Sequence, residues 1–197
     1  MATLSDDVKS FRLQMSRYER SNMWLSLLLD CYAMIDFSVS KSIEQSEKKV
    51  ACYKGCSVCC YQVIPLSTIE CMGIKFYVQN ILNQRFRSFL IKKFNEHKSI
   101  CLFNIDDCCI VYSLRPIACR RYIVCSKPCE INEDPIVTRS SDVLESSREH
   151  LYCAIEMTLA FYKHQNIHLQ DGEHIFDFYK RQNVKLSSVY ESIINDL

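Results

Sequence analysis

Ten of the thirteen cysteines in this 197-residue chain fall into two blocks, and these blocks constrain the fold more than any other feature. The first block is spaced as Cys52-x3-Cys56-x2-Cys59-Cys60. Short-spaced thiols in two separated blocks are typical of a thiolate metal site, because a short turn aims neighbouring sulfurs at one ion and the second block closes the shell. The second block comprises Cys101, Cys108, Cys109, Cys119, Cys125 and Cys129.

The supply of thiols exceeds what one tetrahedral zinc ion needs. Cys59 and Cys60 are adjacent, and consecutive side chains of an extended backbone point to opposite sides, so this pair favours a cluster or two neighbouring sites. Thiolates match both iron–sulfur clusters and zinc. We expect a four-iron iron–sulfur cluster first and zinc second, with Cys108 and Cys129 as weaker candidates. The expected ligands are Cys52, Cys56, Cys59, Cys60, Cys101, Cys109, Cys119 and Cys125.

The remaining cysteines and the cations in the blocks have simpler interpretations. Cys31, Cys71 and Cys153 lie on predicted helical faces, where a cysteine packs as a small apolar side chain. The odd cysteine count argues against a disulfide framework. The polar, acidic start has no secretory signal, so we expect a cytoplasmic location, where disulfides are rare. Basic side chains in the blocks either balance thiolate charge or are ordinary solvated loop residues. They are Lys54, Arg115, Arg120, Arg121 and Lys127.

The scarcity of glycine and proline, three and four residues respectively, argues against a many-turned β fold. We therefore expect a mostly α single domain over residues 1–197, a helical bundle with a central cysteine-rich, irregular metal-binding region. N-terminal helices at 5–49 and C-terminal helices at 140–196 enclose this cysteine-cluster core at 52–129. The first helix should bury Leu4, Val8, Phe11, Met15 and Tyr18 on one face.

Finer elements follow from periodicity and capping residues. A second helix should bury Trp24, Leu27, Leu28, Cys31 and Ile35 and run to about residue 49. Ser67 and Glu70 form a capping-box pattern before a helix at 68–82, and helices at 84–97, 172–182 and 186–195 are also expected. A short strand should cover 110–112. A long helix at 142–164 should bury Val143, Ser147, Leu151, Ala154, Ile155 and Tyr162.

Charge and the minor motifs narrow the function further. The net charge of +1 gives no electrostatic argument for nucleic acid or an anionic membrane as a partner. The apolar stretch at 23–39 contains two aspartates and predicts a buried helix, not a membrane span. Asp106-Asp107 is typical of a turn. His164 and His168 have metal-ligand spacing, but the polar residues between them predict a solvated helix end.

The cysteine pattern, with Cys109-Ile-Val-Tyr112-Ser-Leu-Arg115-Pro116-Ile-Ala-Cys119-Arg120, resembles the CxxCxxCC zinc- or iron-chelating domain family. The resemblance covers about residues 52 to 125. The chain departs from the family pattern in its first gap, three residues instead of two, and in a valine at 111. The family includes the flagellin lysine N-methylases, which implies an iron–sulfur cluster, S-adenosylmethionine as cofactor and a protein substrate.

Three functions remain open from the sequence. The first is a cysteine-cluster metal-binding protein whose centre is structural or handles electrons. The second, implied by the resemblance, is an S-adenosylmethionine-dependent protein-lysine methyltransferase, in which Arg115 and Arg120 hold charge near the cofactor. The third is an interaction module that zinc stabilises. A closed four-thiolate zinc favours the third function, and an open coordination position beside a cleft favours the second.

Overall fold

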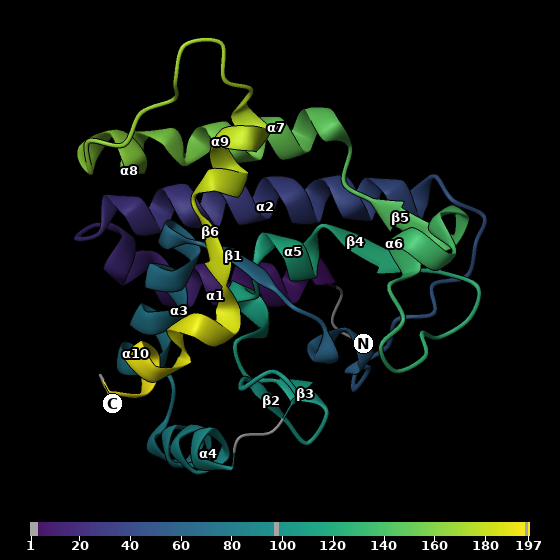
Figure 1. Cartoon of the computed structure of the whole chain (residues 1–197), viewed down its shortest axis with the longest axis horizontal. Coiled ribbons are helices and arrows are strands. Elements are labelled where there is room, and N and C mark those ends of the chain that lie inside the picture. Colours follow the sequence, from purple (N-terminus) through teal and green to yellow (C-terminus); the bar gives the residue numbers. More distant parts are fainter. Residues whose placement is uncertain (1–3, 97–98, 196) are drawn as a thin grey trace.

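The computed structural model describes residues 4–96, 99–195 and 197, and it is mostly helical. Helix α2 (Met23–Glu44) lies at the centre, with α1 (Leu4–Glu19) on one side and α7 (Arg148–Met157) on the other. Figure 1 shows α2 and α7 running side by side, with α5 (Ile117–Arg120) and β4 (Tyr122–Val124) beneath α2. The mostly α fold class is therefore confirmed.

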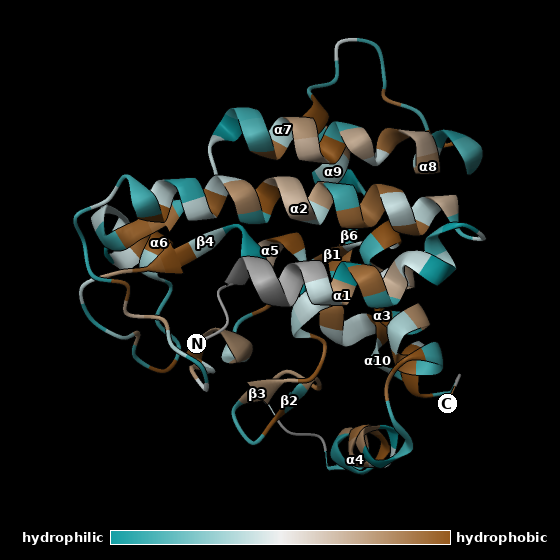
Figure 2. Cartoon of the chain, turned by 180° about the vertical axis from the view of Figure 1, so that it is seen from behind, coloured by the Kyte–Doolittle hydropathy of each residue, from teal (hydrophilic) through white to brown (hydrophobic). Residues whose placement is uncertain are grey.

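The buried face of α2 is an apolar stripe that makes it the main element of the first core. Leu25, Leu28, Cys31 and Ile35 recur at helical spacing and are fully buried. Figure 2 shows hydrophobic residues recurring along α2. By length and hydropathy alone α2 could cross a membrane, and 44% of its apolar window is buried inside the protein.

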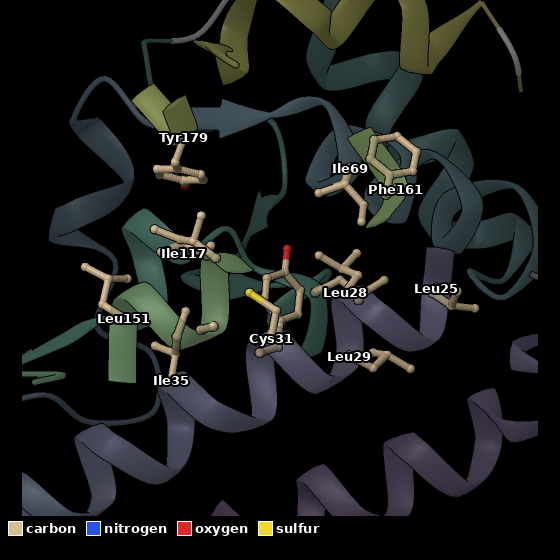
Figure 3. Packing of buried hydrophobic residues seen from close by; sticks show 14 of the residues in the cluster. Leu25, Leu28, Leu29, Cys31, Ile35, Ile69, Ile117, Leu151, Phe161 and Tyr179 are labelled. Atoms are coloured by element: carbon tan, nitrogen blue, oxygen red, sulfur yellow. The ribbon is translucent and has the colours of Figure 1, made fainter. Parts of the chain in front are cut away.

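The first core is formed where several helices meet the buried face of α2. Cys31 packs there among Leu28, Ile117, Leu151 and Tyr179 (Figure 3). Helix α3 (Thr68–Asn80) approaches α2 closely at Gly73, where an added Cβ would lie 2.4 Å from Leu28 Cδ2. Helices α8 (Leu159–His164) and α9 (Ile175–Arg181) complete this side.

A second core lies between the other face of α3 and the elements around it. These are β1 (Pro65–Ser67), α4 (Gln84–Asn95), the 3₁₀ turn η4 (Leu186–Val189) and α10 (Tyr190–Ile194), and β6 (Asn183–Lys185) lies beside β1. Strands β1 and β6 pair antiparallel, with Leu66 opposite Val184. Three cysteines of the second block, Cys101, Cys109 and Cys119, pack against this core, so the cysteine region is built onto it.

The expected helices at 68–82 and 84–97 are present with slightly earlier ends. The α3 capping box is confirmed, with the Ser67 backbone N–H donating to Glu70 Oε2 at 2.9 Å. Helix α4 begins at the Asn83 cap and ends at Asn95, and the predicted endpoint His97 lies outside the described residues. The second helix ends at Glu44 instead of residue 49. Met15 is buried and Phe11 and Tyr18 pack on the first core as expected, whereas the Leu4 and Val8 side chains lie outside the described part.

The predicted long helix at 142–164 is wrong. Residues Val143–Glu145 form strand β5, which pairs with β4, and Ser147 is an exposed helix cap whose hydroxyl accepts from the His150 backbone N–H. A second break follows at Thr158, whose Oγ1 donates to the Ile155 carbonyl at 2.7 Å and competes with the helical ladder. The C-terminal helices expected at 172–182 and 186–195 are shorter, at Ile175–Arg181 and Tyr190–Ile194.

The predicted strand at 110–112 is also misplaced. The chain forms instead a hairpin of β2 (Asn104–Ile105) and β3 (Cys108–Cys109), and residues Tyr112–Leu114 form the 3₁₀ turn η2. Asp106 and Asp107 connect the two strands with φ of 49° and 59°, the backbone of a two-residue type I′ turn. The predicted turn at this dipeptide is thus confirmed.

Candidate metal centre

The first cysteine block lies in a loop whose start is fixed by strand β4 and the residue after it. The Ala51 backbone N–H donates to the Val124 carbonyl at 2.8 Å, and Val50 forms an antiparallel bridge with Cys125. Gly55 has φ of 91°, which lets the loop turn tightly before Cys56. The 3₁₀ turn η1 (Val58–Tyr61) then carries the adjacent cysteines of this block.

The second block is joined to the first through backbone and side-chain hydrogen bonds. The Cys101 N–H donates to the Cys60 carbonyl at 2.8 Å. The β2–β3 hairpin places Cys109 opposite Asn104, and Asn104 Nδ2 donates to Cys60 Sγ at 3.7 Å. Short helix α5 carries Cys119. Four separate segments therefore bring one cysteine each to the same region.

We name Cys60, Cys101, Cys109 and Cys119 the core group, because their thiols interact electrostatically beside the second core. Burial raises the pKa of Cys119 well above its ordinary value, and the other three thiols raise it further. Burial likewise raises the pKa of Cys109 to about 12, with contributions from Cys101 and Cys60. Each of these thiols, when ionised, disfavours the ionisation of its neighbours, as like charges close together do.

Three further cysteines, Cys52, Cys56 and Cys129, form a second set that we name the rim group. Burial raises the pKa of Cys52, and the neighbouring thiols of Cys56 and Cys129 raise it further. Burial also raises the pKa of Cys129, and Cys56 is among the groups that act on it. The rim group lies where the first loop runs beside the chain after β4, and Gln62 Nε2 links these two segments by donating to the Glu133 carbonyl at 2.5 Å.

The vicinal pair Cys59–Cys60 connects the two groups. The backbone here is a 3₁₀ turn, not the extended backbone assumed from the sequence, and the two thiols hydrogen-bond to each other. That hydrogen bond lowers the pKa of Cys60 to about 6 and raises the pKa of Cys59. Cys59 also interacts with Cys119 of the core group and Cys56 of the rim group. Cys59 therefore interacts with both groups.

Several of these sulfurs accept hydrogen bonds from N–H groups. The Val124 backbone N–H donates to Cys52 Sγ at 3.4 Å, and Arg139 Nη2 donates to Cys129 Sγ at 3.4 Å. In the core group the Asn104 amide donates to Cys60, and the backbone of Phe103 and of Val111 hydrogen-bonds to the thiols of Cys101 and Cys109. Such donors are the outer-shell partners that orient and stabilise metal-bound thiolates.

Two cysteines of the blocks stand apart from both groups. Cys125, an expected ligand, is buried, and its thiol interacts chiefly with Lys48 and Asp142. Its thiol is the weakest of the neighbours acting on Cys52, and its carbonyl accepts from Arg139 Nη1 at 3.3 Å. Cys108 is exposed on the hairpin. Among the cysteines expected to be buried on helices, Cys31 is confirmed, Cys71 is half-buried, and Cys153 is exposed, which corrects that expectation.

The two arginines that the sequence assigned to cofactor binding are held in an ion-pair network with Asp36. Arg120, whose side chain is 1% exposed, donates to Asp36 Oδ2 at 2.6 Å and to the Arg115 and Ser113 carbonyls. Its guanidinium also stacks on the Tyr32 ring at 3.7 Å. Arg115 lies 3.5 Å from Asp36, and its charge lowers the pKa values of Cys109 and Cys119 against their burial.

Arg120 therefore fixes the backbone around α5. Arg115 acts electrostatically on the thiols of Cys109 and Cys119, and Lys93 acts on those of Cys60 and Cys101. The cleft that both arginines line has a volume of about 50 Å³. Sites for cofactor-sized ligands hold roughly 300–1,000 Å³, so S-adenosylmethionine does not fit the cleft in this shape. Arg139, the cation that contacts a sulfur directly, was missed from the sequence because it lies ten residues after Cys129 and outside any motif.

The cysteine side chains have the chemistry and the number that a thiophilic metal requires, but their sulfurs do not converge on one point. Among the side chains that the structure describes, no three histidine, cysteine, aspartate or glutamate groups are close enough together to hold a metal ion. His164 and His168 are exposed at and beyond the end of α8, as expected for a solvated helix end.

No protein-family model, curated protein sequence or solved structure matches the chain.

Proposed function

We propose that this chain is a metal-binding protein that holds an iron–sulfur cluster through Cys60, Cys101, Cys109 and Cys119. The observation that supports this most directly is the gathering of these four thiols, from four separate segments, at the edge of a hydrophobic core. Four cysteine thiolates are the usual ligand set of a four-iron cluster. When bound, such a centre supplies one-electron chemistry or structural stability.

Among the described residues no close three-ligand group is present, and this fits a cluster better than a single zinc ion. Zn–S bonds of about 2.3 Å in a tetrahedron place the sulfurs about 3.8 Å apart. The described cysteines interact electrostatically but are not packed tightly enough to chelate one ion. A four-iron cluster is itself several ångströms wide and takes thiolates that stand farther apart.

The surroundings of the core group suit the charge of such a centre. A four-thiolate cluster is anionic, and a buried anion needs hydrogen-bond donors or cations nearby. The Asn104 amide donates to Cys60, and the charge of Arg115 favours the thiolates of Cys109 and Cys119. The methyltransferase and the zinc-stabilised interaction module have no such support among the described residues, so the proposal is limited to metal binding.

Metal and sulfide analysis of protein purified without oxygen tests the proposal. We expect a brown protein in which iron and acid-labile sulfide occur together. Cys109→Ser and Cys119→Ser should each lose most of this iron, whereas Cys153→Ser, at an exposed position of α7, should keep it. Colourless protein with stoichiometric zinc and no sulfide would replace the cluster by zinc. A metal-free protein with an intact fold would refute metal binding altogether.

A further inference from the structure

An open apolar groove runs between α2 and α7 at the surface of the protein. Its volume is about 600 Å³, and among the residues that the structure describes no cysteine of the two blocks lines it. Figure 2 shows α7, α2 and α1 side by side on the face opposite α9. The residues that line the groove include Leu27, Asp30, Met34 and Phe37 of α2 and His150 and Met157 of α7. The outer side of the central helix therefore forms much of this groove, while its inner side forms the first core.

The outer side of α2 carries a stripe of residues that are spaced alternately by four and three positions. We name this stripe the α2 seam, and its members are Met23, Leu27, Asp30, Met34, Phe37, Lys41 and Glu44. A spacing of about 3.5 residues is typical of a helix that packs along a second helix. Met23 is 70% exposed and Phe37 is 57% exposed, so large apolar side chains of the seam face solvent in the single chain. Such a surface is suited to burial by a partner.

We infer that the α2 seam joins two copies of this chain, with α2 packed antiparallel on α2 of the second copy. The inference goes beyond the proposed function and does not depend on the metal centre. In a twofold symmetric interface, a residue i that contacts residue j of the partner is matched by a contact of j with the partner's i. A twofold axis at the midpoint between Met34 and Phe37 places each of them opposite the other in the second copy. Asp30 and Lys41 lie at equal distances from this midpoint, so the same axis places Asp30 opposite the partner's Lys41.

The charges of the seam are complementary in this antiparallel arrangement. Arg12 binds Asp30 Oδ1 at 2.7 Å and Glu19 Oε2 at 2.9 Å, so two carboxylates share one guanidinium and the group carries one net negative charge. Lys41 is exposed and has no ion-pair partner among the residues that the structure describes. The second copy therefore supplies a cation to each acidic group, twice in the dimer. Parallel packing would instead place like charges opposite each other, which disfavours association.

The apolar middle of the seam suits the same partner. Phe37 is held against α7 by an edge-on contact with His150, with the two ring centroids 5.7 Å apart. The His150 ring is fixed in turn by Ser147, whose Oγ lies 2.7 Å from His150 Nδ1. An aromatic side chain that is already ordered in the single chain loses little conformational freedom on binding. Each Phe37 then packs against the partner's Met34, and the dimer contains this contact twice.

Sedimentation velocity of the full chain, with a reductant present to exclude intermolecular disulfides, tests the inference. The wild type should shift from 23.1 kDa towards twice that mass as its concentration rises. Asp30→Lys and Lys41→Asp should each be monomeric over the same range, because each change places like charges opposite each other. An equimolar mixture of these two variants should dimerise, since each chain then supplies the charges that the other lacks. Lys163→Asp, at an exposed position of α8, is the matched control and should dimerise as the wild type does.

Phe37→Ala tests the apolar contact without changing a charge, and it should raise the Kd of the dimer about tenfold or more. Circular dichroism establishes that each variant is folded. A wild type that stays monomeric at every concentration overturns the inference. A dimer that persists unchanged in Asp30→Lys, Lys41→Asp and Phe37→Ala also overturns it, because the chains would then meet through another surface. Folded single variants whose mixture stays monomeric would overturn the antiparallel arrangement.

Discussion

The Glu70 carboxylate accepts a hydrogen bond from the backbone N–H of Ile117 at 2.6 Å, which ties the start of α3 to the start of the helix that carries Cys119. The same fully buried carboxylate accepts from Ser67 Oγ at 2.6 Å and from the Tyr179 hydroxyl at 3.2 Å. One side chain therefore connects a helix cap, the first core and the segment that positions a candidate ligand.

Replacing Glu70 should destabilise the fold and the cysteine region together. Glu70→Ala leaves several buried donors without acceptors, and we expect a loss of about 3 kcal/mol or more in the free energy of unfolding. Glu70→Gln should also be destabilising, because its amide NH₂ would face a donor. Urea denaturation measures the effect, with exposed Glu156→Ala as control. Equal stability of Glu70→Ala and Glu156→Ala would contradict this role for the carboxylate.

The Asn104 amide should matter for the metal more than for the fold. Asn104→Ala removes the N–H donor to Cys60 Sγ, and loss of an outer-shell partner typically weakens metal affinity by about 10–100-fold. Competition with a chelator, followed by absorbance, measures the change. Asn95→Ala, at an exposed position of α4, is the control and should match the wild type. An unchanged affinity in Asn104→Ala would show that this contact does not support a metal-bound thiolate.

The Asp36–Arg120 pair should be among the most costly charge interactions to break. Asp36→Ala leaves the buried Arg120 guanidinium without its carboxylate, and removal of one partner from a buried ion pair typically costs about 3–5 kcal/mol. Exposed Asp177→Ala, which breaks a surface pair with Lys180, should cost under about 1 kcal/mol. Thermal denaturation compares the two variants, and similar melting temperatures would refute the distinction.

Any side chain at Gly73 should destabilise the fold as long as Leu28 keeps its position. In Gly73→Ala the new Cβ meets Leu28 Cδ2 at 2.4 Å between two packed helices, so we expect overpacking to cost about 1–3 kcal/mol. Shortening the neighbour in the double variant Gly73→Ala/Leu28→Val should recover part of that loss. If the double variant is less stable than the sum of the two single changes predicts, the helices do not meet in this way.

The sequence predicted the features that depend on local pattern. The apolar stripe of α2, the Ser67–Glu70 capping box and the Asp106–Asp107 turn all follow from residue spacing and are present. The break of the helix expected at 142–164 could not be predicted this way. Residues Val143–Glu145 pair with β4, and that pairing depends on a segment twenty residues earlier in the chain.

The candidate site shows the same division between local and long-range information. Spacing identified both cysteine blocks and the vicinal pair, but it could not assign each thiol to a group. Cys60 belongs with Cys101 because their backbones pair, and Cys129 belongs with Cys52 and Cys56 because the loop after β4 folds beside the first loop. The motif around Cys119 identified Arg120 as a candidate, but its burial beside Asp36 depends on tertiary packing, which residue spacing does not reveal.

Iron K-edge X-ray absorption on anaerobically purified protein tests the central proposal most directly, because it reports the atoms bound to the metal. We predict a first shell of sulfur alone and a second shell of iron, the pattern of a cluster ligated by cysteine. A first shell containing oxygen or nitrogen, or a sulfur shell with no iron neighbour, would contradict a cluster held by Cys60, Cys101, Cys109 and Cys119.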